Sequence, residues 1–201
     1  MARTSREKYE FIILAVISDR LHGVGPSLLR FVLKSLSRLY SLIMNVRLAL
    51  YEHLLLHPKT LGCQVISIGN LTVGGTGKTP VVEVFARALQ KNSRKVAILS
   101  RGYKKVETPF SEKLKNFITF KPPTQQPPRV VSDGERLRLD SDMGGDEPYM
   151  LASNLPNVCV LVDKDRVKSG RYAIQKLGCD TLILDDGFQY LKLKHRVDIV
   201  L

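Results

Sequence analysis

Cysteine is scarce in this sequence, and acidic residues are outnumbered by basic ones. The three cysteines, Cys63, Cys159 and Cys179, are an odd number without C-x-x-C spacing, so neither a disulfide framework nor a structural zinc site is predicted. We therefore expect a reducing compartment. Nineteen Asp and Glu residues stand against 31 Lys and Arg, and the resulting net charge of +12 favours anionic partners such as nucleotides, anionic lipid surfaces or nucleic acid.

A long uncharged apolar run is also missing. Arg30, Lys34, Arg38 and Arg47 interrupt the most apolar region, so no transmembrane helix is predicted. The apolar stretch at residues 11–17 has the minimum length for a signal-peptide core and is crowded by charges, and we interpret it as a short helix. The 201 residues, 44% hydrophobic and 25% charged, indicate one globular domain with an appendage.

Residues 27–56 have a helical pattern with a narrow polar face and a wide apolar surface. The polar positions are Ser27, Arg30, Lys34, Ser37, Arg38, Ser41 and Asn45. A helix of this kind fits a membrane interface, where its cations face lipid phosphates. The alternative is a helix packed on the domain core. We expect residues 1–60 to form a helical membrane-associating segment and residues 61–201 to form the main domain.

Short β-branched runs dominate the rest of the chain. They occur at residues 65–68, 96–99, 158–162, 181–184 and 197–201, and helical patterns lie between them around residues 81–89 and 167–177. Continuous apolar runs are typical of strands buried on both faces. The alternation predicts an α/β fold with a parallel sheet flanked by helices.

Two inserted features interrupt the α/β pattern. The proline-rich segment 121–128 predicts a loop or linker, because its four prolines lack backbone donors. Asp133-Gly134 lies between alternating residues and predicts a small β-hairpin.

The strongest local signal runs from the strand at 65–68 through a glycine-rich turn into a helix. This is the setting of a phosphate-binding P-loop. Its glycines let backbone N–H groups point at phosphate oxygens, while Lys78 would reach the β- and γ-phosphates and Thr79 would hold Mg²⁺. Thr72 stands where the strict pattern has glycine, and the alternative is a structural turn. The candidate nucleotide-binding residues are Thr72, Val73, Gly74, Gly75, Thr76, Gly77, Lys78 and Thr79.

Carboxylates at two other places are candidates for phosphoryl-transfer chemistry. Asp185 and Asp186 follow the strand at 181–184, and an acidic residue there would hold the Mg²⁺ of a P-loop site. Asp146 and Glu147 lie in a glycine-rich turn before a predicted helix at 149–153, and one of them could accept the proton of an attacking hydroxyl. The alternatives are an exposed strand end for the first pair and a helix cap for the second.

Taken in order, these motifs resemble those of the tetraacyldisaccharide 4'-kinase family across residues 35–201. The matching segments are Ile68–Pro80, Leu99–Tyr103, Gly145–Pro148, Asp165-Arg166 and Leu184–Gln189. The resemblance implies a P-loop NTPase-like fold with an N-terminal amphipathic helix. It also implies transfer of the ATP γ-phosphoryl group to the 4'-hydroxyl of an acylated diglucosamine phosphate lipid, the lipid A precursor.

The resemblance further assigns residues and a location. Asp146 would be the catalytic base, Asp186 a Mg²⁺-associated carboxylate with catalytic importance, and the N-terminal helix the element that docks peripherally on the cytoplasmic face of the inner membrane. That surface would account for the positive charge without nucleic acid. Possible substrate-contacting or supporting residues are Arg101, Tyr103, Glu147, Gln189 and Tyr190.

Two departures from the family pattern stand out. Tyr190 replaces a histidine, and the family has a second lobe with a histidine that partners the catalytic Asp. We therefore expect this chain to be the N-terminal portion of a longer enzyme, or a fragment that only binds nucleotide. A GTPase-type regulatory module is another alternative, although residues 162–165 lack the leading Asn or Thr of a guanine-reading motif. No aromatic stacking platform supports a nucleic-acid-binding module.

Overall fold

The computed structural model describes residues 15–18, 20–21, 23–53, 55–70, 77–102 and 127–201. The chain divides into two compact units, Met1–His57 and Pro58–Leu201. Of the short helix predicted at 11–17, residues 15–17 are helical, and residues 11–14 lie outside the described part.

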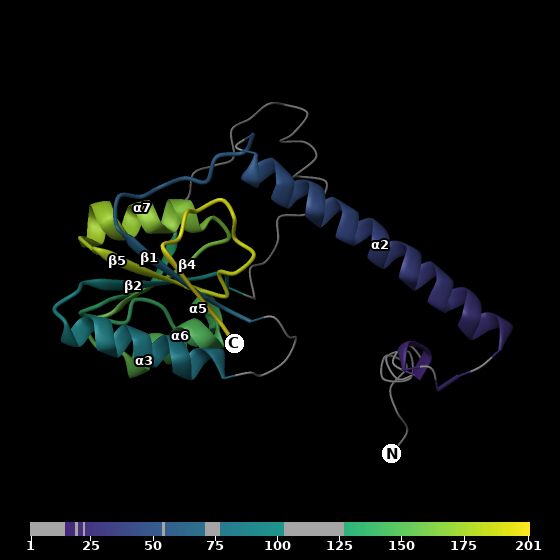
Figure 1. Cartoon of the computed structure of the whole chain (residues 1–201). Coiled ribbons are helices and arrows are strands. Elements are labelled where there is room, and N and C mark those ends of the chain that lie inside the picture. The colour runs from purple at the N-terminus through teal and green to yellow at the C-terminus, as the bar shows by residue number, and fades with distance from the viewer. Residues whose placement is uncertain (1–14, 19, 22, 54, 71–76, 103–126) are drawn as a thin grey trace, which may run out of the picture. The chain divides into compact units, whose positions relative to one another are not determined.

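The first unit contains the long helix α2 (Val24–Glu52), which confirms the helix predicted at 27–56 within a few residues (Figure 1). None of its 29 residues is buried, and large apolar side chains such as Leu28, Phe31 and Leu36 are exposed. Arg30 donates hydrogen bonds to the backbone carbonyls of Val16, at 3.1 Å, and Leu21, which ties the start of α2 to the preceding residues. Among the described residues, no helix is long and apolar enough to span a bilayer.

The second unit is built on a six-stranded sheet of order β3-β4-β2-β5-β1-β6. Its strands are β1 (Gln64–Gly69), β2 (Val96–Ser100), β3 (Arg129–Asp133), β4 (Cys159–Val162), β5 (Thr181–Asp185) and β6 (Val197–Val200). All neighbouring pairs are parallel except β3 with β4. The parallel strands coincide with the predicted apolar runs to within one residue or so at each end, so the predicted parallel α/β fold is confirmed.

Helices cover both faces of the sheet, with α7 on one face and α3 and α6 on the other (Figure 1). The helices of this unit are α3 (Lys78–Lys91), α5 (Ser141–Gly144), α6 (Asp146–Asn154) and α7 (Arg166–Leu177). Successive side chains of a strand point to opposite faces, so each strand feeds both layers. In β5, Ile183 packs under α3 and α6, while Leu182 and Leu184 pack under α7.

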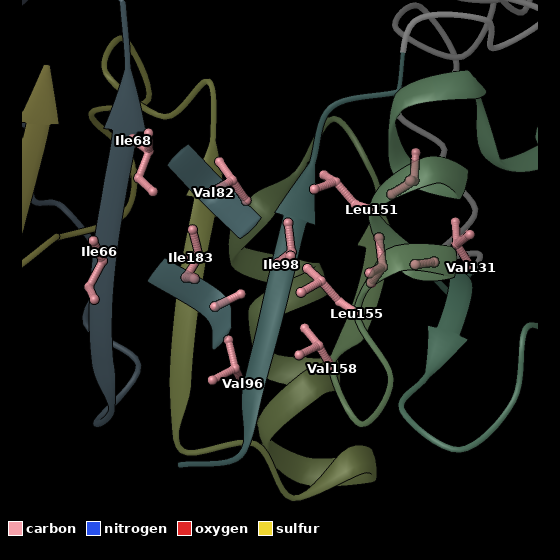
Figure 2. Packing of buried hydrophobic residues seen from close by; sticks show 14 residues of the cluster. Ile66, Ile68, Val82, Val96, Ile98, Val131, Leu151, Leu155, Val158 and Ile183 are labelled. Carbon is pink, nitrogen blue, oxygen red and sulfur yellow. The ribbon is translucent and has the colours of Figure 1, made fainter. Parts of the chain in front are cut away.

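The core between the sheet and the layer of α3 and α6 is shown in Figure 2. Ile68 and Ile98 project from β1 and β2 towards Val82 of α3 and Leu151 of α6, and each of these four side chains is at most 1% exposed. Burying a side chain of this size contributes about 1.5–3 kcal/mol. This packing holds α3 against β1 and β2.

The predicted hairpin around Gly134 is only partly formed. Its first arm is β3, but the main partner of β3 is β4, to which it pairs antiparallel at the edge of the sheet. The expected second arm supplies one isolated bridge, between Ser132 and Leu137. Pairing with a buried strand satisfies more backbone groups than a lone hairpin can, which explains the difference.

Asp133 holds the turn that follows β3. Its carboxylate accepts hydrogen bonds from the backbone N–H groups of Arg136 and Glu135, at 2.8 and 3.0 Å, and pairs with Arg138. The N–H of Arg136, followed by the other donors, holds the pKa of this carboxyl below its usual range. Most of the predicted proline-rich loop, residues 121–126, lies outside the described residues.

Candidate active site

The P-loop motif begins at the end of β1 and ends in the first turn of α3, so the strand and the helix that were predicted to flank it are confirmed. Gly77 is the N-cap of α3 and has a φ of 72°, in the left-handed region that favours glycine. Lys78 and Thr79 follow in the first turn of the helix, where backbone N–H groups point outward and favour anions. The remaining candidates, Thr72, Val73, Gly74, Gly75 and Thr76, lie outside the described residues.

The two candidate aspartates lie beside this motif because β5 is the direct neighbour of β1. Ile68 pairs in register with Asp185. The next residue, Asp186, has a φ of 55° and its Oδ1 lies 3.0 Å from the Nζ of Lys78, in an ion pair whose side chains are 53% and 28% exposed. An exposed pair of this kind adds little stability. Its significance is positional, since it joins the cation of the P-loop to the acidic turn after β5.

A close backbone approach holds the turn after β5 against β1. A Cβ added at Gly69 would lie 2.4 Å from the Cβ of Phe188 and 3.1 Å from its backbone nitrogen. The N–H of Gly187 also donates to the carbonyl of Ile68 at 3.2 Å. Glycine at position 69 therefore allows the acidic turn to pack directly on the end of the P-loop strand.

Asp185 is the buried member of the acidic pair, at 9% exposure. Burial raises the pKa of its carboxyl, and the negative charge of Glu147 raises it further, while a hydrogen bond from the Ser100 hydroxyl acts in the opposite direction. Glu147 in the first turn of α6 is therefore close enough to Asp185 to affect its ionisation. A bound cation would offset the cost of a desolvated carboxylate at this position.

Asp146 and Glu147 are exposed in the first turn of α6. The N-cap of this helix is Gly145, with a φ of 93°, and no side chain makes a capping hydrogen bond there. Asp146 therefore does not act as the N-cap. Its carboxylate lies at the positive end of the helix dipole.

A network of side chains lies next to the carboxyl end of β5. It consists of Arg166, Asp165 and Tyr190. Arg166 is 4% exposed, and its Nη2 donates to the carbonyl of Asp185 at 3.3 Å. Its guanidinium lies 5.2 Å from the centroid of the Tyr190 ring. Burial lowers the pKa of Arg166, and the nearby positive charge of Arg101 acts in the same direction.

The Tyr190 hydroxyl completes this network. It accepts a hydrogen bond from the backbone N–H of Arg166 at 3.0 Å and donates to the carboxylate of Asp165 at 3.1 Å. Asp165 is also the N-cap of α7 and accepts from the N–H groups of Val167 and Lys168. A carboxylate engaged in this way is poorly placed to read a guanine base, which argues against the GTPase alternative.

The other sequence candidates are placed less tightly. Arg101 follows β2 and Gln189 follows the acidic turn, both exposed, while Tyr103 lies outside the described residues. Ser100 was missed, although its position at the carboxyl end of a strand neighbouring β5 is a signal that could have identified it.

No group of three or more His, Cys, Asp or Glu suited to a metal ion occurs among the residues that the structure describes. Mg²⁺ needs fewer protein ligands when nucleotide phosphates complete its coordination, and two carboxylates with the Thr79 hydroxyl fit that requirement.

The whole chain is similar to proteins of one family. A family model described as Tetraacyldisaccharide-1-P 4'-kinase matches residues 29–117 and 119–201. A tetraacyldisaccharide 4'-kinase of Desulfotalea psychrophila is 42% identical over 166 residues, which are 83% of this chain and 43% of that protein. One of Halothermothrix orenii is 34% identical over 201 residues, which are 100% of this chain and 48% of that protein.

A solved structure is similar as well. The crystal structure of the "apo" form of LpxK from Aquifex aeolicus in complex with ATP matches with a TM-score of 0.70 and 39% sequence identity, covering 86% of this chain and 48% of that one. The chain spans about half the length of the curated relatives it matches.

Proposed function

This chain belongs to the tetraacyldisaccharide-1-P 4'-kinase family, and we propose that it binds ATP and takes part in transferring the γ-phosphoryl group to the 4'-hydroxyl of a tetraacyldisaccharide 1-phosphate. The observation that carries the proposal is the ion pair between Lys78 and Asp186 at the carboxyl edge of β1 and β5. It brings the charged groups that a phosphoryl-transfer site needs to one place, beside the N-terminus of α3.

The nucleotide would lie with its phosphates over the first turn of α3. Backbone N–H groups of that turn and the Lys78 ammonium would bind the β- and γ-phosphates. Thr79, Asp185 and Asp186 would hold Mg²⁺, which supplies charge neutralisation at the phosphate oxygens. Ser100 and Arg166 would keep Asp185 in place, through its side chain and its carbonyl respectively.

Asp146 is the proposed general base. Its carboxylate would accept the proton of the attacking 4'-hydroxyl as the oxygen bonds to the γ-phosphorus and ADP leaves. Two observations support this role: Asp146 is not the N-cap of α6, and its neighbour Glu147 acts electrostatically on Asp185. The base would therefore stand beside the acidic edge where the γ-phosphate is expected.

Replacing Lys78 by Ala tests the nucleotide site. The ammonium makes charge-assisted contacts with phosphate, each worth about 1.5–3 kcal/mol, so the ATP affinity should fall about 10–100-fold. Lys91→Ala, at the exposed last turn of the same helix, removes the same charge away from the site and should leave the affinity unchanged. Titration calorimetry with ATP and Mg²⁺ measures both, and equal ATP affinities for Lys78→Ala and the parent chain would refute the assignment.

We also propose that α2 docks peripherally on an anionic bilayer, at the cytoplasmic face of the inner membrane. The support is the unburied apolar surface of α2 together with exposed Lys34 and Arg38 on its polar stripe. Apolar side chains would enter the interface while these cations contact lipid phosphates. Arg30 donates hydrogen bonds to the backbone carbonyls of Val16 and Leu21, so we do not count it among the cations that contact lipid.

A further inference from the structure

Polar side chains join the helix α3 to the end of α6. The two helices lie in contact on one face of the sheet (Figure 1). Glu83 accepts a hydrogen bond from the Nδ2 of Asn154 at 2.7 Å, and Arg87 donates to the backbone carbonyl of Asn154 at 2.8 Å. Gln90 donates to the carbonyl of Pro156 at 2.9 Å. We call the side chains of Glu83, Arg87, Gln90 and Asn154 the interhelical network.

The spacing of these residues explains why α3 can hold the end of α6. Positions 83, 87 and 90 are separated by four and then three residues, so they lie on one face of the helix. The last carbonyl groups of a helix have no partner within it, and basic side chains can supply one. Arg87 supplies it for Asn154, the last residue of α6. Side chains of α3 therefore cap the carboxyl end of α6.

The interhelical network gives direction to a contact that is otherwise apolar. Val82 and Ala86 of α3 belong to the same buried cluster as Leu151 and Leu155, at the end of α6. Apolar contacts are non-directional, so by themselves they tolerate small shifts of one helix along the other. Hydrogen bonds require short distances and favourable angles. The network therefore fixes the position of α6 along α3, although exposed polar contacts of this kind add little stability.

Each of the two helices begins at a residue of the candidate active site. Lys78 begins α3, five residues before Glu83, and Asp146 begins α6, eight residues before Asn154. With a rise of about 1.5 Å per residue, the network lies about 7.5 Å along α3 and about 12 Å along α6 from these starts. Regular helix joins the network to both residues. A shift of α6 at the network would therefore move the candidate base relative to Lys78.

We propose that the interhelical network couples α6 to nucleotide binding at α3 and so positions Asp146 for phosphoryl transfer. The proposal rests on the proposed function. Glu83, Arg87 and Asn154 are positioning residues, because they lie at the other end of α6 from Asp146 and act through the helix. Proton transfer to Asp146 requires its carboxylate at a fixed place beside the γ-phosphate, and a displacement of about 1 Å in such a site can cost about 100-fold in rate.

Hydrogen exchange of the 201-residue chain, read by mass spectrometry, tests the coupling. A non-hydrolysable ATP analogue with Mg²⁺ should slow amide exchange in residues 146–154 of the parent as well as at the start of α3. Glu83→Ala and Asn154→Ala each remove one side of the same hydrogen bond, so each should abolish the slowing in α6 while the affinity for the analogue is unchanged. Glu83→Gln keeps an acceptor and should restore the slowing. Ser153→Ala is the matched control, because its hydroxyl donates only to a carbonyl within α6.

The same variants separate positioning from binding in the transfer reaction. With [γ-³²P]ATP and a tetraacyldisaccharide 1-phosphate, Glu83→Ala and Asn154→Ala should each lower kcat at least about tenfold with the KM for ATP unchanged. The variant that combines both changes should be no slower than either alone, because the two side chains share one contact.

The proposal is overturned if the analogue slows no exchange in α6 of the parent, if α6 is slowed equally in Glu83→Ala, or if Glu83→Gln behaves like Glu83→Ala. Failure of the parent to bind the analogue would refute the nucleotide site and this coupling together. Absence of transfer by the parent, with slowing in α6 that still depends on Glu83, would refute the proposed function and leave the coupling of the two helices supported.

Discussion

Removal of the Tyr190 hydroxyl probes a departure from the family pattern. The variant Tyr190→Phe keeps the ring over Arg166 but deletes the hydrogen bonds at 3.0 and 3.1 Å to the Arg166 N–H and the Asp165 carboxylate. Each is worth about 1 kcal/mol net, so we expect a loss of about 1–2 kcal/mol of stability. The melting temperature should fall by roughly 2–8 °C for a domain of this size.

Urea denaturation measures this loss directly, because a lower midpoint with an unchanged slope reports stability alone. Tyr172→Phe is the control, since Tyr172 lies half-buried on α7, the helix that Asp165 caps, and should tolerate the change. Tyr190→His should recover part of the loss, because an imidazole can accept from one partner and donate to the other. Wild-type stability of Tyr190→Phe, or an equal loss in Tyr172→Phe, would refute the network as a stabilising element.

Two further predictions concern the helix α2 and the turn after β3. Lys34→Glu/Arg38→Glu should lower the affinity for anionic vesicles, measured by co-sedimentation at low salt, by about 30-fold, since each cation near such a surface contributes about 1 kcal/mol. The control Lys91→Glu/Lys176→Glu should leave this affinity unchanged. Equal effects of the two double variants would show that only the net charge matters. Asp133→Asn should destabilise the chain at pH 7. The folded-state pKa of Asp133 is depressed, so the stabilisation by its carboxylate is present above its unfolded pKa of about 3.9 and is lost as the pH falls through the folded value. The difference in stability between variant and parent should therefore vanish in acid. A difference that does not depend on pH would contradict this prediction.

The parallel part of the fold was predictable because its central strands are mostly apolar runs. Residues 96–99, for example, are apolar at every position and correspond to β2, as expected for a strand that is covered on both faces. The partner of β3 was not predictable in the same way. Its pairing with β4 depends on a contact between residues 26 or more positions apart, whereas Asp133-Gly134 signals only a local turn.

The candidate site, like the fold, was predictable only in part. Lys78, Asp185 and Asp186 could be proposed from the sequence because each belongs to a short motif next to the end of a strand. The contacts that position them depend on tertiary packing, as with the Ser100 hydroxyl at Asp185 and the Tyr190 hydroxyl at Asp165. Sequence spacing carries no information about such contacts, since they join three different strand ends.

The measurement that tests the central claim most directly is transfer of label from [γ-³²P]ATP to a tetraacyldisaccharide 1-phosphate, with the parent protein and with Asp146→Asn. We predict acceptor-dependent labelling by the parent and a loss of about 10²–10⁴-fold in Asp146→Asn, with ATP binding retained, because general base catalysis contributes that much. Undiminished turnover with Asn at position 146 would show that Asp146 serves only the α6 helix. Absence of labelling by the parent under conditions where it binds ATP would contradict the assignment of this edge of the sheet to phosphoryl transfer.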